Sequence, residues 1–476
     1  MNKFSFLACV LAAVPLLASC DKENGINGGD GSEASFETSI VIDGNDINMT
    51  VLPSDSSAVY VSGLIMEDDY AAMGGADGVV SYVEELVANG EAELRSGNYT
   101  GLYGDLFWQT KYYSYVAQID GSVVVGTPVI EEQYIYRPYV EFASESVAIG
   151  PCAVSDNGLW VVGNAYNGDT RNSFIYDVRR DSLTIVEGVS LYDMTDDGAA
   201  YGTSGPYPVI YKDGQITEIS SVGTFAESGF YGVTPDGSLA VGFTMSDGMK
   251  NSAIVYENGA VSEISAVGYK EGKINGAAAK GVGSNGNIVG YIQNEEPWLE
   301  IGCAWTGTSH EYSLFAEDLM VWNPDLLDGG GALEKRYGDL EIRISPNGRY
   351  YAGYLVVTEE GSWDQPQYVF VYDAQQDKMH ELIDGNYAGW RPDAVSSAGL
   401  LFLSSTSVGQ SSEPFVWDLN TGEVSALAEY ASAEYGYAPE EHTIQGSVVA
   451  VSEDGKTIVG DYVESTYITY ICFIPR

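Results

Sequence analysis

From residue 138 onward, short runs of alternating apolar and polar residues stand on either side of a recurring four-residue polar phrase. In the copy Ser155-Asp156-Asn157-Gly158, "CAV" precedes the phrase and "LWVVG" follows it. Asp and Asn side chains bond nearby backbone N–H groups, and Gly takes the positive φ that a tight turn needs. Alternation over such short runs indicates half-buried strands. Each copy therefore predicts a β-hairpin.

The phrase occurs seven times, in eroded form at Gly286 and Gly399, and two further apolar runs follow each copy except the last. Its turn glycines are Gly158, Gly198, Gly237, Gly286, Gly348, Gly399 and Gly455, which stand 39 to 62 residues apart (237 − 198 and 348 − 286). The third run has an aromatic residue near its end, as in "FVWD" at 415–418, and a fourth short run follows a second turn. Four strands repeated at this period are typical of a β-propeller blade. We predict an all-β chain with a seven-bladed β-propeller over residues 138–476.

Two features of this region predict how the blades pack. A glycine recurs in the second run, at Gly163, Gly242, Gly290, Gly353 and Gly460. Because a strand glycine often marks a close backbone approach, we expect a neighbouring sheet to pack there. The last copy ends after its third strand, at "YICFIPR". We expect "PYVEFAS" at 138–144 to supply the missing fourth strand, which closes the ring and removes free strand edges.

The phrases "RISPNGRYYAGY" and "FVWDLNTGEVSAL" give this region a family resemblance. It resembles WD-repeat-like propellers and the HAF-type extracellular repeat over about residues 138–476, although the Gly-His dipeptide of true WD repeats is missing. The resemblance implies the propeller fold. It implies no single function, because members of these families bind many different partners.

Residues 33–137 follow another pattern. Three alternating runs in "SIVIDGNDINMTVLPSDSSAVYVSGLI" predict strands, and apolar residues at 79, 80, 83, 86 and 87 have the period of a helix. Two more strands are expected around Asp120-Gly121, although Gly121 could instead anchor an eighth blade. The long aromatic strand that begins with Thr110-x-Tyr112 resembles the later strands of fibronectin type III modules. We predict a fibronectin type III-like β-sandwich with a helical insertion.

The first residues predict where the protein resides. Residues 1–19 combine a basic start with a short apolar run, which is typical of a signal peptide and too short to span a bilayer. Leu17-Ala18-Ser19-Cys20 resembles the lipobox of bacterial lipoproteins, which implies lipidation of Cys20. Residues 20–32 then form a polar, Gly-rich tether. Asp21-Lys22-Glu23 resembles the surface-export signal of Bacteroidota lipoproteins, which implies an outer-membrane, lipid-anchored protein that faces the cell surface.

Charge and motif content exclude several classes of function. The chain has 21 Lys and Arg against 68 Asp and Glu, a formal net charge of −47. Nucleic-acid binding and attraction to anionic lipid both need clustered cations, so we expect no nucleic-acid partner and membrane contact only through Cys20. No nucleophile, metal or phosphate-binding motif is present. The three histidines are scattered, and Cys152, Cys303 and Cys472 lie in apolar runs typical of small buried residues. We therefore predict no catalytic residue, no cofactor and no metal.

The remaining candidates are aromatic and acidic residues in the long connections of the later repeats. Flat rings with nearby carboxylates suit sugar rings or peptides, although such rings can equally pin down their own loops. The candidate ligand-binding residues are Trp298, Trp322, Trp363, Asp364, Tyr435 and Tyr437.

Together these features predict a non-catalytic cell-surface lipoprotein whose propeller face binds a glycan or peptide, or serves as a scaffold for a neighbouring surface protein. The alternative is a surface glycoside hydrolase or lyase that uses a carboxylate pair at the propeller axis. With 68 acidic residues, the sequence alone singles out no such pair.

Overall fold

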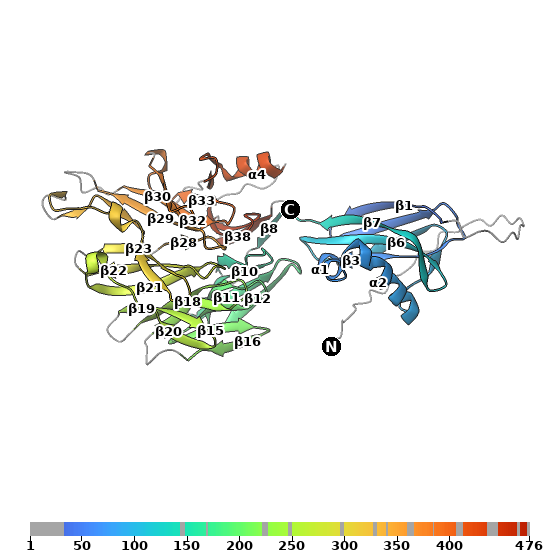
Figure 1. Cartoon of the computed structure of the whole chain (residues 1–476), viewed down its shortest axis with the longest axis horizontal. Coiled ribbons are helices and arrows are strands. Elements are labelled where there is room, and N and C mark those ends of the chain that lie inside the picture. The colour runs from blue at the N-terminus through green and yellow to red at the C-terminus, as the bar shows by residue number, and fades with distance from the viewer. Residues whose placement is uncertain are drawn as a thin grey trace, which may run out of the picture. The chain divides into compact units, whose positions relative to one another are not determined.

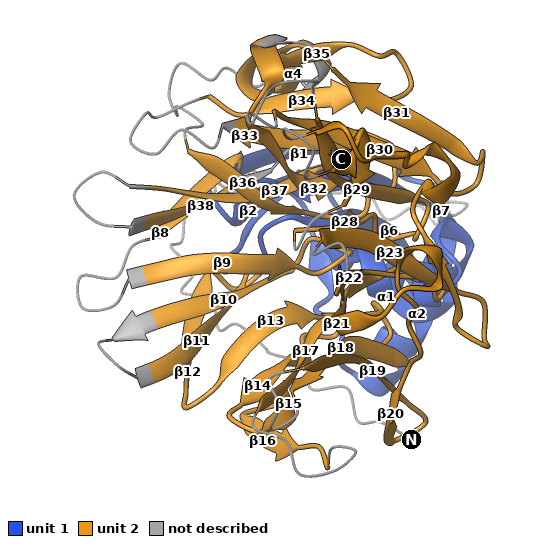
Figure 2. Cartoon of the chain, turned by 90° about the vertical axis from the view of Figure 1, so that its left-hand side faces the viewer, with its two compact units in different colours: residues 1–137 blue, residues 138–476 orange. Residues whose placement is uncertain are grey.

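The computed structural model describes residues 33–142, 148–167, 170–220, 227–245, 250–295, 299–326, 331–338, 341–358, 366–383, 385–405, 413–435, 446–463 and 467–473. The chain divides into two compact units, residues 1–137 and 138–476, which Figure 2 shows in blue and orange. Figure 1 labels the helices and strands of both units. Within the described residues, none of the helices combines the length and the apolar character needed to cross a bilayer.

The first unit contains two antiparallel sheets, with the strand orders β1-β2-β5 and β4-β3-β6-β7. The strands are β1 (Phe36–Asp43), β2 (Asp46–Pro53), β3 (Val59–Met66), β4 (Arg95–Ser96), β5 (Tyr99–Tyr103), β6 (Thr110–Asp120) and β7 (Val123–Ile135). Helices α1 (Glu67–Ala72) and α2 (Ala76–Asn89) come between β3 and β4. Gly121 forms the tight turn between β6 and β7, at a φ of 65°.

A sandwich core forms where the two sheets face each other. Ile47, Met49 and Val51 of β2 pack against Tyr60 of β3, together with Tyr112, Val116 and Ile135. On the other face of β3 and β6, helix α2 buries Val79 and Val83. These are two of the residues whose spacing predicts the helix. The unit also contains β4, β5 and α1, which the sequence pattern did not predict.

The second unit consists of antiparallel sheets that are consecutive along the chain. Most have four strands in sequence order, with the first strand at one edge and the fourth at the other. Figure 2 shows first strands such as β21 and β32 near the middle of this unit, and fourth strands such as β16, β20 and β35 at its border.

Their bounds are as follows. The first two sheets contain β9 (Ala148–Val154), β10 (Trp160–Asn167), β11 (Thr170–Asp177) and β12 (Ser182–Glu187), and then β13 (Ser190–Met194), β14 (Ala200–Ser204), β15 (Tyr207–Lys212) and β16 (Gln215–Glu218). The next two contain β17 (Glu227–Val233), β18 (Leu239–Met245), β19 (Asn251–Glu257) and β20 (Ala260–Glu263), and then β21 (Ile274–Val282), β22 (Ile288–Asn294), β23 (Leu299–Thr306) and β24 (Glu311–Leu314). The last three contain β27 (Lys335–Tyr337), β28 (Arg343–Ile344), β29 (Tyr350–Val357), β30 (Gln367–Asp373) and β31 (Lys378–Leu382); β32 (Trp390–Val395), β33 (Leu400–Ser405), β34 (Phe415–Asp418) and β35 (Val424–Ala426); and β36 (Ser447–Val451), β37 (Thr457–Val463) and β38 (Tyr467–Phe473) with β8 (Tyr139–Phe142). Smaller elements are β25 (Trp322–Asn323) paired with β26 (Ala332–Leu333), α4 (Leu427–Tyr435), and the short 3-10 helices η1 (Tyr269–Glu271), η2 (Glu317–Leu319) and η3 (Gly385–Tyr387).

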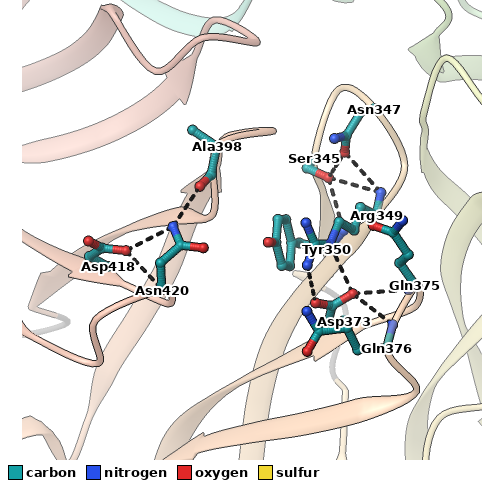
Figure 3. A network of polar contacts seen from close by, with 10 residues as sticks. All are labelled: Ser345, Asn347, Arg349, Tyr350, Asp373, Gln375, Gln376, Ala398, Asp418 and Asn420. Carbon is teal, nitrogen blue, oxygen red and sulfur yellow. Dashed lines mark hydrogen bonds and ion pairs between the residues drawn. The ribbon is translucent and has the colours of Figure 1, made fainter.

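The recurring phrase forms the turn between the first two strands of a sheet, as predicted. In Figure 3, the Ser345 hydroxyl donates to Asn347 Oδ1 (2.8 Å) and accepts from the backbone N–H of Arg349 (3.2 Å) and Tyr350 (3.0 Å). The Arg349 guanidinium then reaches Asp373 at the end of the third strand, with distances of 3.0 and 2.7 Å to its two carboxylate oxygens. The Asp after the aromatic residue of the third strand therefore anchors the hairpin turn.

Backbone hydrogen bonds join the turns of different sheets. The backbone N–H of Asp196 donates to the carbonyl of Pro235, that of Ser284 to the carbonyl of Pro346, and that of Ser397 to the carbonyl of Glu453. Glu453 of the last phrase donates to the carbonyl of Asp156 in the first phrase (3.0 Å). One of these bonds therefore joins the last sheet to the first.

The sheets also pack in a closed circle. Each first strand contacts the sheet before it, as β13 contacts β10 and β17 contacts β14, and β9 of the first sheet contacts β36, β37 and β38 of the last. Strand β8 pairs antiparallel with β38, with Val140 opposite Ile471 and Tyr139 opposite Cys472. The predicted closure by the segment at 138–144 is confirmed for its described part, and this closed circle of antiparallel sheets is a β-propeller architecture.

Candidate functional site: the axial cavity

The first strands of the sheets (β9, β13, β17, β21, β28, β32 and β36, hereafter the inner strands) share a local irregularity. In six of them the pairing with the second strand slips by one residue at the same place in the repeat, three residues before the Ser, Thr or Gly that opens the turn phrase. The residues left out of the pairing are Cys152, Tyr192, Tyr231, Lys280, Asp393 and Val449. Each slip is a β-bulge, a device that re-aims a side chain.

The recurring glycine of the second strand explains how the bulge is accommodated. A Cβ on Gly163 would lie 2.2 Å from the carbonyl oxygen of Gly150, and one on Gly242 would lie 1.9 Å from that of Gly229. Both glycines pair at the slip, beside the bulged residue. The close approach therefore comes from the inner strand of the same sheet. Our expectation that a neighbouring sheet packs there is wrong at these positions.

All six bulged residues line one cavity of about 390 Å³, the axial cavity. Residues of every inner strand contribute to its wall, and Ile342 and Arg343 take part where the pairing of β28 is short. Residues far apart in the sequence meet here because the circle of sheets brings each inner strand to the centre. The wall combines two cations, two carboxylates, two tyrosines and a thiol among small apolar residues.

The two cations belong to adjacent sheets. The Lys280 ammonium lies 3.9 Å from the centre of the Tyr231 ring and 5.9 Å from that of Tyr291, which is cation–π geometry. Burial, reinforced by the positive charge of Arg343, lowers the pKa of Lys280 to about 8. Arg343 donates from Nε to the backbone carbonyl of Asp393 (2.9 Å). Among the described residues, neither cation forms an ion pair with a carboxylate.

The two carboxylates differ in their partners. Asp193 accepts from the backbone N–H of Val233 (2.8 Å) and of Met194 (2.9 Å), and burial nevertheless raises its pKa to about 7. Asp393 is 3% exposed, and its Oδ1 accepts from Arg391 Nε at 2.7 Å. Its Oδ2 is buried without a hydrogen-bond partner. Burial raises the pKa of Asp393 to about 7, against the opposing charge of Arg391.

The remaining polar wall is formed by Tyr192, Tyr231 and Cys152. The two tyrosine rings meet edge to face at 5.3 Å, and the Tyr231 ring also stacks on Phe243 at 4.9 Å. Cys152 Sγ accepts a hydrogen bond from the Asn164 amide (3.2 Å), and burial raises its pKa to about 12.

The predicted role of the cysteines as small buried core residues holds for Cys303, which is fully buried in the core. The prediction is wrong for Cys152, which is partly exposed and lines the cavity. The Cys472 side chain lies outside the described part.

The six ligand-binding candidates predicted from the sequence lie elsewhere. Trp298, Trp363, Asp364 and Tyr437 fall outside the described residues, and of Tyr435 only the backbone is described, at the end of α4. Trp322 is half-buried in β25 and packs against the apolar core shared by the sheets that contain β22 and β29. Its indole lies close to Gly331, where a side chain would not fit. The described residues therefore bring none of these candidates together.

A larger hollow of about 760 Å³ lies between the sheets of β23 and β30. Its charged lining residues are all acidic: Glu317, Asp318 and Asp377. The axial cavity is smaller, but it combines two neighbouring cations, a buried carboxylate oxygen without a hydrogen-bond partner and residues from every inner strand. Among the described residues, no group of three or more His, Cys, Asp or Glu side chains is placed to hold a metal ion.

In the sequence, the axial residues could have been identified only by their position relative to the turn phrase, and no residue pattern of the repeat marks that position. They are the residues three positions before the turn phrase, as Asp393 is relative to Ser396. Their chemical types differ from copy to copy, so neither a motif nor a period marks them.

Comparison with known proteins identifies no family for this chain. No protein-family model matches it, and no curated protein matches it. Among solved structures, it is similar to oligogalacturonate lyase from Vibrio parahaemolyticus, with a TM-score of 0.46 at 8% identity over 71% of this chain and 97% of that one.

Two further solved structures are similar at a comparable level. The β-propeller domain of the Trilobed protease from Pyrococcus furiosus has a TM-score of 0.34 at 8% identity, over 69% of this chain and 82% of that one. The xyloglucanase from Xanthomonas campestris has a TM-score of 0.40 at 11% identity, over 68% of this chain and 52% of that one. At these values the likenesses carry no activity over to this chain.

Proposed function

We propose that this protein is a lipid-anchored, cell-surface binding protein whose seven-bladed propeller takes up a small ligand in the axial cavity. The observation that carries the proposal is the set of bulges, because each presents one side chain to the same cavity. Ligand sites are concave, largely preformed and furnished with a few convergent polar groups. The axial cavity has each of these properties.

Other parts of the chain support the remaining elements of the proposal. Seven turn phrases and a circle of contacting sheets support seven blades. The strand orders β1-β2-β5 and β4-β3-β6-β7 support a fibronectin type III-like module, with its helices inserted between the third and fourth strands. The resemblance of Leu17-Ala18-Ser19-Cys20 to a lipobox supports the anchor on Cys20 and an outer-membrane location.

The experiment that tests the cavity is a binding screen of the purified protein against glycans and peptides, followed by calorimetry. Val449→Trp replaces a bulged residue with a large ring and should fill the cavity without removing a polar group. Ile216→Trp, at an exposed position of the outer strand β16, is the matched control. We expect Val449→Trp to abolish binding and Ile216→Trp to preserve it.

The same screen separates this site from the aromatic candidates in the later loops. A ligand that Val449→Trp still binds, and that Trp363→Ala or Tyr435→Ala no longer binds, would move the site to those loops. A surface protein that co-purifies with the parent and binds Val449→Trp equally well would favour the scaffold function.

The anchor is tested separately in a bacterial host that processes lipoproteins. We expect the parent protein to incorporate labelled fatty acid and to sediment with membranes. Cys20→Ala should do neither, since it removes the sulfur that carries the lipid. A Cys20→Ala protein that still incorporates the label would refute the anchor.

One observation favours a second function, a glycoside hydrolase or lyase. Asp193 and Asp393 both line the axial cavity, and burial raises the pKa of each to about 7, as a general acid requires. Binding ranks first because the Asp193 carboxylate is already engaged by two backbone N–H groups. Release of shortened product from a bound oligosaccharide, abolished by Asp393→Asn, would reverse this order.

A further inference from the structure

Among the described residues, the two cations of the axial cavity are placed together and neither forms an ion pair, although the charge of Glu341 acts on Lys280 and that of Arg343 acts on the Asp393 carboxyl. Lys280 and Arg343 lie on adjacent inner strands, close enough for the charge of Arg343 to lower the pKa of Lys280. This happens in a chain with a formal net charge of −47, where 68 acidic residues offer many possible partners. Two like charges in a partly desolvated space repel each other, and an anion between them would relieve that repulsion.

Both cations are held in place before any ligand arrives. Tyr231 and Tyr291 flank the Lys280 ammonium, and the Tyr231 ring is itself fixed by stacking on Phe243. Arg343 is held from its Nε by the carbonyl of Asp393, and its described hydrogen bonds use Nε and Nη1 only. The second terminal nitrogen forms no hydrogen bond among the described residues, and Arg343 lines the cavity. Such preorganisation reduces the entropy that binding costs.

The same cavity contains an acceptor that needs a donor. Asp393 Oδ2 has no hydrogen-bond partner, although the residue is only 3% exposed. Buried polar atoms are nearly always satisfied, so an orphaned oxygen in a cavity wall points to a missing donor. A hydroxyl group on a ligand has the required chemistry.

We propose that the axial cavity selects a hydroxylated carboxylate, a sugar acid such as a uronic acid, with Lys280 and Arg343 holding the carboxylate and Asp393 Oδ2 accepting a hydroxyl. This inference rests on the proposed function and names its ligand class. A neutral sugar would leave the cations unpaired, and a simple carboxylate would leave Asp393 Oδ2 unpaired. The cavity of about 390 Å³ is in the range of small-molecule sites.

Calorimetry with three matched probes tests the inference on the purified protein. D-glucuronate has both the carboxylate and the hydroxyls, D-glucose has the hydroxyls alone, and propionate has the carboxylate alone. We expect D-glucuronate to bind about tenfold or more tightly than either of the others, because each of those leaves a buried polar group without its partner. Equal binding of D-glucose would overturn the inference.

Variants assign the effect to the cavity. Lys280→Met should weaken D-glucuronate binding about tenfold or more, and Lys280→Arg should restore part of it, since the charge returns. Lys378→Met removes an exposed lysine of β31 and is the matched control, with unchanged binding expected. Arg343→Gln is a second, independent variant if Lys280→Met melts at a lower temperature than the parent. Unchanged binding in both cavity variants would overturn the inference.

Two further arms complete the design. An oligosaccharide that ends in glucuronate distinguishes the acidic end of a longer glycan from a free sugar acid as the source of the ligand.

Failure of the inference and failure of the proposed function are also distinguishable. A neutral glycan or peptide whose binding is abolished by Val449→Trp would refute the sugar acid and keep the binding function. Val449→Trp with undiminished D-glucuronate binding would refute the axial site itself.

Discussion

At the scale of single residues, burial in the second unit changes the chemistry of ordinary side chains. Lys280 and Asp156 illustrate this in opposite ways. Lys280 is a cation that burial and a neighbouring cation make easier to deprotonate. Asp156, in the first turn phrase, is a carboxyl whose pKa is raised to about 8 by burial and by the nearby charges of Asp193, Asp196 and Glu453. Each leads to a prediction that titration can check.

Lys280 should titrate well below the other lysines. Reductive methylation with a carbon-13 label, followed by NMR, should show one lysine signal with a midpoint near pH 8. Lys280→Arg identifies that signal by removing it. Because the charge of Arg343 contributes to the shift, Arg343→Gln should raise the midpoint toward the usual lysine value of about 10.4. A parent protein in which every lysine titrates near that value would contradict the described surroundings of Lys280.

Asp156 should make the folded state less stable as the pH rises. Its folded-state pKa is about 8, whereas an unfolded Asp has a pKa near 3.9. Between these values the folded protein binds the proton and the unfolded chain does not, so the free energy of unfolding falls as the pH rises from about 4 to about 8. Asp156→Asn should therefore be more stable than the parent at pH 8 and about equally stable at pH 4, measured by thermal unfolding.

Asp236, in the third turn phrase, supplies a control of opposite sign. Hydrogen bonds from the Ser238 side chain and backbone lower the pKa of its exposed carboxyl. Its contribution to stability is present above the unfolded pKa and is lost as the pH falls. Asp236→Asn should thus be less stable than the parent at pH 8. If both variants shift stability at pH 8 in the same direction, the assignment of Asp156 is wrong.

At the scale of elements, the β-bulge of an inner strand is paired with the recurring glycine of the second strand in the sheets that have this glycine. In the sheet of β9 and β10, the inner strand shifts by one residue where Gly163 of the second strand has no Cβ, whereas β32 makes the same shift opposite Leu403. The bulge then turns one extra residue of the inner strand toward the axis. In the sheets that have it, the recurring glycine therefore accommodates the same feature that builds the cavity.

Gly163→Ala should destabilise the protein, because its Cβ would lie 2.6 Å from Pro151 Cα and 2.2 Å from the Gly150 carbonyl oxygen. We expect a loss of about 1–3 kcal/mol, as for overpacking of a buried site. Gly150→Ala, in the paired strand β9, is the matched control, since nothing lies within 4 Å of its Cβ. Chemical denaturation measures both. A Gly163→Ala protein as stable as Gly150→Ala would show that the bulge does not depend on the glycine.

At the scale of the whole molecule, β8 joins the two ends of the second unit. It comes from residues Tyr139–Phe142 and completes the sheet of β36, β37 and β38 near the end of the chain. A hydrogen bond between turns joins the last sheet to the first at the same seam, from the Glu453 N–H to the Asp156 carbonyl. Closure of this kind removes strand edges that would otherwise pair with other molecules.

Val140→Asp should open this seam. Val140 is 4% exposed and pairs with Ile471, so an aspartate there would bury an unpaired charge, at a cost of about 3 kcal/mol. Hydrogen exchange should show faster exchange at Thr469 and Ile471, which face β8. Leu183→Asp, on the exposed outer strand β12, is the control and should leave exchange in β38 unchanged. Unchanged exchange in both variants would mean that β8 adds nothing to closure.

Much of the fold could be predicted from the sequence because its signals are local. Most of the hairpins are specified by Ser or Thr, Asp or Asn, and Gly within four residues, as Ser345 and Asn347 illustrate with their bonds to the following backbone. The helix at 79–87 and the closing strand at 138–144 follow from periodicity and from a strand missing at the end of the repeat. These features depend on contacts between residues that are close in the sequence or between regularly spaced strands. A sequence repeat reveals both kinds of contact.

The site could not be predicted in this way, because only the tertiary structure decides which residues face the axis. A bulge shifts the alternation by one residue, so the period of a strand does not reveal where Lys280 or Asp393 points. Their chemistry also depends on neighbours that are distant in the sequence, such as Arg343 beside Lys280. The sequence by itself determined the strands, the turns and their repetition. The closed circle of sheets decided which side chains share one desolvated space, and therefore what that space can bind.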